Sequence, residues 1–267
     1  MKRSRYGLKF YIGGALFVLF ALLILWGLIR TPFDPKEMDA ALKLAPVSFK
    51  HPMGCDQFGR DIFSRVLVGI RTTFLIACGT NLIGVFFGIV IGALTGYFGG
   101  IIDEILMRFN DAVLSFPSIL LALVFIALMG SGTYRIMIAM GIVFVPSYAR
   151  IVRAEFIRCR NMDYVSSVKL MGAGPLRIMF VHILPNVKNT LLTSLIIGFN
   201  NAVLCEAAMS FLGIGVQPPD ASLGLMLSDA QAYLFIAPRY ALLVGSVMVL
   251  LILGFALLSD ALKEALP

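Results

Sequence analysis

The sequence predicts an all-α, polytopic membrane protein with about six transmembrane helices. Hydrophobic residues make up 59% of the 267 residues and charged residues only 14%. A soluble domain has about 45–50% apolar and about 25% charged residues. A soluble fold of this length cannot bury such an excess of apolar side chains. These side chains also fall into long uninterrupted runs, so we expect them to face lipid.

The first span is expected at the start of the chain. Basic residues up to Lys9 are followed by an apolar run from Phe10 to Ile29. A cleaved signal peptide also begins with basic residues, but its apolar core is shorter and a small-residue cleavage site follows. Because Arg30-Thr31-Pro32 follows here, we expect an uncleaved anchor helix.

Later apolar runs are also long enough to cross a bilayer. The segment Tyr134–Val152 is a weaker candidate because Pro146 interrupts it, although proline is tolerated in membrane helices. With it the chain has six spans, and both termini lie on the same side. The other four runs are Phe74–Phe98, Ala112–Gly130, Leu191–Met209 and Tyr240–Leu258.

We therefore divide the chain into three parts. Residues 1–72 form an N-terminal tail, the first span and an external loop. Residues 73–260 form a five-helix core with a long loop at about 150–186. Residues 261–267 form a C-terminal tail.

The distribution of basic residues predicts the orientation. More Lys and Arg fall on the face with both termini and the loop at 150–186 than on the other face, which places the first face in the cytoplasm. The net charge of +7 is spread over the gaps between apolar runs. It forms no single basic stripe, so we expect no nucleic-acid partner.

Glycines recur at every fourth position in the second predicted span, at Gly84, Gly88, Gly92 and Gly96. This spacing places them on one helix face, where small residues let two helix backbones approach closely. Close packing is the favoured interpretation, and a mobile gate is the alternative.

The loop at 150–186 is longer than an ordinary connection between helices. Its segment 163–172 predicts a short amphipathic helix with Asp163 as the N-cap and Gly172 as the stop. Such a helix can project from the membrane to dock on a partner, or it can lie in the membrane interface. Its apolar residues are expected largely on one side: Val165, Val168, Leu170 and Met171.

Several chemistries are not supported by the sequence. The four cysteines include no C-x-x-C pair, and His51 and Cys55 alone do not make a metal site, so we expect no bound metal or other cofactor. A phosphate-binding G-x-x-x-x-G-K-[ST] loop is absent, and so is the G-x-S-x-G of a hydrolase. An ion-coupled transporter that works alone would carry more intramembrane carboxylates and no docking loop.

Four segments in the same order carry a family resemblance. The segment Asp163–Asn186 resembles the signature EAA loop of binding-protein-dependent ABC importer permeases, with Ser166-Ser167-Val168 in place of the Glu-Ala-Ala. Three more segments are similar to those of the dipeptide, oligopeptide and nickel permeases. They are Gly54–Arg65, Met107–Pro117 and Glu206–Pro219.

The resemblance implies a type I ABC importer permease fold and a non-catalytic subunit in a prokaryotic inner membrane. Expected partners are a second homologous permease, two ATPase subunits that hold ATP and Mg, an extracellular or periplasmic binding protein, and lipid. The implied cargo is a dipeptide or oligopeptide, with nickel or another metal chelate as the alternative. Residues expected to couple to the ATPase are Asp163, Tyr164, Val165, Ser166, Ser167, Val168, Lys169, Met171, Gly172 and Ala173.

Other motif residues are expected to be structural. Arg60 and Arg65 should each pair with a nearby carboxylate, in a collar on the outer face or, less favoured, in a contact for the binding protein. Glu206 is interpreted as a hydrogen-bonded structural acid rather than a substrate ligand. Asp111 should pair with Arg108 in the same helix. The full set is Asp56, Gly59, Arg60, Asp61, Arg65, Arg108, Asp111, Pro185, Glu206 and Gly213.

Overall fold

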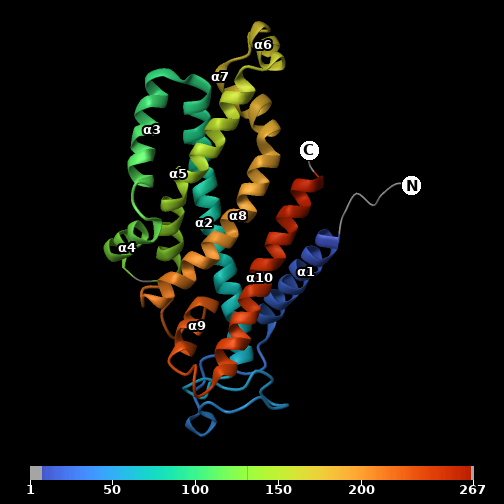
Figure 1. Cartoon of the computed structure of the whole chain (residues 1–267), viewed down its shortest axis with the longest axis vertical. Helices are drawn as coiled ribbons and strands as arrows, with labels where there is room; N and C mark the ends of the chain where they lie inside the picture. The colour runs from blue at the N-terminus through green and yellow to red at the C-terminus, as the bar shows by residue number, and fades with distance from the viewer. Residues whose placement is uncertain (1–7, 131, 266–267) are drawn as a thin grey trace, which may run out of the picture.

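The computed structural model describes residues 8–130 and 132–265, and its long elements are all helices (Figure 1). Within these residues, five helical segments are long and apolar enough to cross a membrane, or six if one bent helix pair counts as a span. The expected all-α membrane fold is confirmed. The five are α1 (Leu8–Ile29), α2 (Ile62–Phe98), α5 (Thr133–Arg160), the segment Pro175–Phe211 that ends in α8 (Leu184–Phe211), and α10 (Pro238–Ala265).

The third predicted span, Ala112–Gly130, is wrong as a continuous helix. The chain there forms α3 (Gly100–Leu114) and α4 (Ser118–Met129), which are bent by 91° relative to each other. Pro117 explains the break, since proline lacks a backbone N–H and disfavours helical geometry in the residue before it. The bent pair leads the chain away from the end where α2 stops, and α5 brings it back (Figure 1).

Two expected part boundaries also differ from the structure. The boundary between residues 72 and 73 falls inside α2, which already begins at Ile62. The tail expected from residue 261 is helical as far as Ala265, as part of α10. In both places polar residues lower the local hydropathy, but neighbouring turns continue the backbone hydrogen bonding of the helix.

α2 and α5 pack closely along the glycine face. A Cβ atom added at Gly88 would lie 2.5 Å from the Cβ of Tyr148, and one at Gly92 would lie 2.6 Å from the Ala149 carbonyl oxygen. Pro146 lies within α5, and its carbonyl accepts a hydrogen bond from the side-chain Nδ2 of Asn110 in α3 at 3.1 Å. These contacts favour close packing as the role of the glycines.

The two ends of the molecule differ in structure (Figure 1). At one end α6 (Asp163–Leu170) is followed by the short α7 (Pro175–Arg177) and a π-helix, Ile178–Ile183, that leads into α8. At the other end, residues 30–61 form a loop region with a 3-10 turn, Ala40–Leu42, beside α9 (Leu223–Gln231). The start of α1 and the end of α10 lie towards α6.

Candidate functional site

α6 is fastened to the helix bundle by its inner face. Val165 is 3% exposed, and Tyr164, Val168 and Ala173 are partly buried against the same apolar cluster. This cluster brings together residues of α5, the π-helix and α8: Phe156, Cys159, Ile178, Met179, Ile183 and Val187. α6 thus shares one apolar cluster with the ends of two long helices, α5 and α8.

The outer face of α6 is apolar and exposed at its C-terminal end. Leu170 is 90% exposed and Met171 77%, and Leu176 beyond the turn is 68% exposed. The expectation that all four apolar residues lie on one side is therefore wrong, since Val165 and Val168 face inward. Large apolar side chains at the tip of a projecting helix are typical of an interaction surface.

The helix ends also differ in part from expectation. Asp163 is the first residue of α6 and not its N-cap, which is Met162. A carboxylate in the first turn still interacts favourably with the helix dipole. Gly172 has a φ of +80°, the left-handed geometry that ends many helices, and a Cβ atom there would meet nothing within 4 Å. Three polar residues of α6 are also exposed: Ser166, Ser167 and Lys169.

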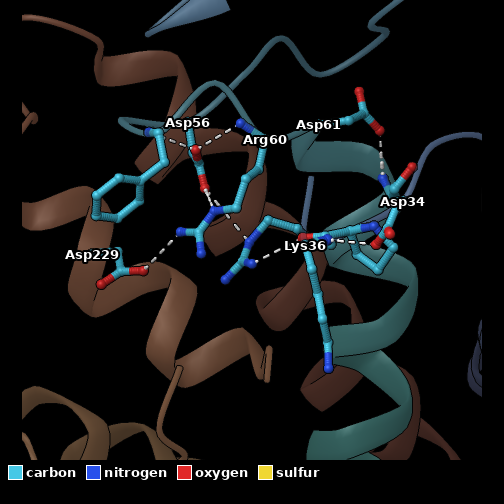
Figure 2. A network of polar contacts seen from close by, with 10 residues as sticks. Asp34, Lys36, Asp56, Arg60, Asp61 and Asp229 are labelled. Carbon is cyan, nitrogen blue, oxygen red and sulfur yellow. Dashed lines mark hydrogen bonds and ion pairs between the residues drawn. The ribbon is translucent and has the colours of Figure 1, made fainter. Parts of the chain in front are cut away.

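At the opposite end lies a buried ion-pair network (Figure 2). Asp56 is fully buried, and its Oδ2 accepts from Nε of Arg60 at 2.7 Å and lies 3.6 Å from Nε of Arg65. Arg60 and Arg65 are only 2% and 1% exposed. Asp229 of α9 lies 3.9 Å from Nη2 of Arg60, and burial raises the pKa of its carboxyl. The geometry favours a structural collar, because Asp56, Arg60 and Arg65 at its centre are not accessible to a binding protein.

The start of α2 is built into this network. Asp61 is the N-cap of α2 and accepts from the Ser64 amide at 2.7 Å, while its other oxygen lies 2.9 Å from Nδ1 of His51. Gly59 has a φ of +76° and passes so close to the Asp39 carbonyl that a side chain has no room. Burial, with the negative charges of Asp61 and Asp56, raises the pKa of the Cys55 thiol to about 11.

The ion pair expected between Arg108 and Asp111 does not form. Nη2 of Arg108 lies 2.7 Å from Glu104 one turn earlier in α3. Asp111 instead accepts from Nη2 of Arg150 in α5 at 2.7 Å. Within α3, Arg108 is four residues from Glu104 and three from Asp111, and both spacings are compatible with an ion pair. The tertiary pair of Asp111 with Arg150 of α5 decides which one forms.

Glu206 lies in α8 and is 1% exposed. Its carboxylate accepts from the hydroxyls of Ser210 at 2.9 Å and Ser222 at 2.7 Å, and from Thr73 of α2 at 3.5 Å. These contacts join α2, α8 and the start of α9, which favours the structural interpretation. The remaining motif residues shape the ends of α8, with Pro185 in its first turn and Gly213, at a φ of +76°, just after its last residue.

Comparison with known proteins assigns the chain to a family. The profile of the family described as "Binding-protein-dependent transport system inner membrane component" matches residues 88–266. The chain belongs to this family. The expected membership is confirmed, and the chain is a multi-pass membrane protein.

Curated relatives match along nearly the whole chain. The dipeptide transport system permease protein DppC of Haemophilus influenzae is 37% identical over 260 residues, which cover 95% of this chain and 88% of that protein. The glutathione transport system permease protein GsiD of Pectobacterium atrosepticum is 35% identical over 257 residues, which cover 96% and 85%. The chain thus resembles these permeases along nearly its whole length.

A solved structure shows the same fold. An inward-facing form of the MetNI methionine ABC transporter superposes with a TM-score of 0.62 at 18% sequence identity, and the match covers 76% of this chain and 96% of that chain. The likeness includes the helical architecture expected for an ABC importer permease.

Three features of the chain were not predicted. α9 is short and mixed in polarity, so hydropathy gives no signal for it, although Ser222 before Leu223 is a typical N-cap. Asp229 within α9 joins the buried collar only through the tertiary fold. Asn186, Thr190 and Ser194 on one face of α8 were also missed, and their spacing of four residues was the available signal.

Proposed function

We propose that this chain is the permease subunit of an ATP-binding-cassette importer and forms half of the pathway through which a peptide crosses the membrane. The observation that carries the proposal is α6, whose inner face is packed against α5 and α8 while its tip exposes Leu170 and Met171. The relatives named as dipeptide and glutathione permeases support a peptide cargo. Their names give no support to nickel.

The proposed transport function requires partners that complete the pathway, supply the energy of ATP and deliver the peptide. A second homologous permease completes the pathway, and two ATPase subunits, which hold ATP and Mg, dock on the α6 ends. A binding protein delivers the peptide at the end formed by residues 30–61. The α6 end and both chain termini then lie in the cytoplasm, in agreement with the bias in basic residues.

The transport step is mechanical in this chain. ATP-driven closure of the ATPase subunits pushes α6, and because Val165 and Val168 pack on the cluster shared by α5 and α8, those helices move with it. The pathway then changes between outward and inward access. This is a two-state element whose equilibrium a nucleotide shifts through a partner. The chain itself carries out no chemical reaction.

Substitutions at the two glycines that follow α6 test its proposed docking role directly. In Gly172→Trp, a bulky side chain enters the space where the ATPase is expected, and uptake of a dipeptide such as alanyl-alanine should be lost although the protein inserts normally. Gly172→Asn tolerates the left-handed backbone and should keep most uptake. Gly174→Trp adds the same bulk two residues on, where the backbone has an ordinary φ of −70°.

The readout is uptake together with ATP hydrolysis by the assembled importer. Loss of coupling in both tryptophan variants but not in Gly172→Asn indicates that bulk at the docking surface matters. Normal coupled uptake in Gly172→Trp contradicts the proposed docking role of α6.

A further inference from the structure

A hollow opens beside the break between α3 and α4. It has a volume of about 430 Å³ and is bounded by α3, α4, α5 and α8. Its polar groups come from hydroxyl and amide side chains, among them Ser147, Tyr148, Ser194 and Asn201, and the rest of its wall is apolar. Among the described residues that line it, none is charged.

A second hollow of about 520 Å³ lies along α8 towards the α6 end. Ser194 lines both hollows, so they meet at this residue. The wall of the second hollow is strongly polar and includes Thr190 and the ion pair of Glu155 with Arg158, whose Nη2 lies 2.6 Å from the carboxylate. Together the hollows follow α8 from the α4 side to the end that carries α6.

Six of the α8 residues that line the two hollows recur at intervals of three or four residues, which places them in one stripe on the helix. Each of these residues is exposed or partly exposed in the chain: Asn186, Thr190, Ser194, Ile197, Asn201 and Leu204. The stripe is polar at four of these six positions. On α1, by contrast, the exposed positions include Leu19, Leu22 and Leu25, which suit lipid.

An amide that faces hydrocarbon without a partner costs several kcal/mol, on the order of 2–7. Polar side chains in a membrane span therefore face a water-filled cavity or other protein. Tyr148 stiffens the wall here, because its hydroxyl bonds the Asn81 side chain of α2 and the Ser194 carbonyl. The stripe is thus held in place by α5 and α2 and left open on the side of the hollows.

We propose that the two hollows are this chain's wall of the cargo passage, and that the hollow at the α3–α4 break contacts cargo through uncharged hydrogen-bonding groups at Ser147, Ser194 and Asn201. Because the first hollow carries no fixed charge, it admits cationic, neutral and anionic peptides alike. Selection by charge falls to other parts of the importer, including the charged wall of the second hollow. This inference rests on the proposed transport function and adds the class of cargo that the wall accepts.

Thiol labelling tests the passage without any knowledge of the cargo. The four native cysteines are replaced by serine or alanine, and single cysteines are introduced as Ser194→Cys and Asn201→Cys in the assembled importer in membranes. The probe is the small charged reagent 2-sulfonatoethyl methanethiosulfonate, which reacts with hydrated thiolates. Controls are Leu192→Cys on the opposite face of α8 and Leu22→Cys on α1, both exposed apolar positions.

Both stripe variants are expected to react at least about tenfold faster than the two controls, because a thiol in an apolar surrounding stays protonated. Equal slow labelling at Asn201→Cys and Leu22→Cys overturns the proposal, since the stripe then faces lipid or is covered by protein. Fast labelling at all four positions also overturns it, since access is then not confined to the stripe.

A charge placed in the hollow tests the cargo class. In Ser147→Asp the ratio of alanyl-lysine to alanyl-glutamate uptake should rise about tenfold, because a fixed negative charge at close range attracts one cargo and repels the other. Ser147→Asn adds similar bulk without charge and should leave the ratio near that of the unmodified importer. An unchanged ratio in Ser147→Asp overturns the claim that cargo passes this residue.

The two experiments also separate this inference from the proposed function. If the unmodified importer takes up none of the dipeptides, the peptide cargo is refuted, while thiol labelling still decides whether the stripe lines a hydrated passage. If dipeptides are imported but the stripe is not labelled, the function stands and the passage lies elsewhere.

Discussion

A buried ion network at one end of the molecule contrasts with an exposed apolar helix tip at the other end. The end formed by residues 30–61 and α9 buries its charges, with Asp56, Arg60 and Arg65 all nearly inaccessible. The α6 end leaves apolar residues in the open, with Leu170 and Met171 mostly exposed. The ion network is thus satisfied within this chain, whereas α6 presents an apolar tip that a partner can cover.

This difference separates stability from function. A buried ion network loses much when one member is removed, because the remaining charges stay desolvated and unpaired. An exposed apolar side chain contributes little to the stability of its own chain but much to an interface that covers it. Substitutions at the two ends should therefore affect different measurements.

The largest loss of stability is expected for Asp56→Ala. This change removes the carboxylate that both Arg60 and Arg65 face, and breaking a buried pair in this way costs about 3–5 kcal/mol. The midpoint of thermal aggregation of the purified protein should fall sharply. The control is Lys36→Ala, whose pair with Asp220 is exposed at the surface and is worth less than about 1 kcal/mol. Similar midpoints for the two variants contradict the structural role of the network.

The next effect concerns the thiol of Cys55. Burial and the nearby carboxylates raise its pKa from 9.0 to about 11, so the thiol stays protonated at neutral pH. The thiolate fraction at pH 8 is lowered about 100-fold by a shift of two units. With Cys55 as the one cysteine kept, alkylation should be slow and should rise about tenfold per pH unit up to pH 10.

A thiol at the other end provides the comparison. Leu170→Cys in a chain without the native cysteines should react quickly and approach its plateau near pH 10, because position 170 is open to solvent. Equal rates at pH 8 for Cys55 and the Leu170→Cys variant show that the collar end is open, and they remove the contrast between the ends.

A smaller loss of stability is expected for Asp61→Ala. The change removes the N-cap of α2, worth about 1 kcal/mol, and the partner of His51. Asp61→Ser keeps a capping oxygen and should recover most of the cap contribution. The measurement is again the midpoint of thermal aggregation. A midpoint for Asp61→Ala as low as that for Asp56→Ala indicates that the cap, and not the ion pairs, dominates this end.

The sequence was sufficient to predict much of the α6 end. Its helix and the glycine that ends it follow from local signals, a short amphipathic pattern and Gly172, which act within one or two turns. The sorting of the apolar face was not predictable in the same way. Whether Val168 or Leu170 faces inward depends on how α5 and α8 approach α6, which local periodicity does not specify.

The collar end was predictable only as a set of residues. The charges of Gly54–Arg65 indicated pairing, but the position of Asp229 beside Arg60 depends on α9, which hydropathy does not reveal. The same limit explains Asp111, whose partner Arg150 is distant in sequence. A hydropathy average also passed over the break at Pro117, because the apolar run continues on both sides of it.

The smallest change in stability is expected at the tip of α6, for the double variant Leu170→Asp with Met171→Asp. Both side chains are exposed, so the free energy of unfolding should change by no more than about 0.5 kcal/mol. Copurification of the ATPase subunits and dipeptide uptake should nevertheless be lost, because charged groups replace the apolar surface that a partner must cover. Val165→Asp is the matched control within the same helix, since Val165 is 3% exposed and a buried charge there should lower stability directly. If the double variant still copurifies with the ATPase and still imports, the exposed tip is not the docking surface, and the contrast between the two ends reduces to a difference in burial.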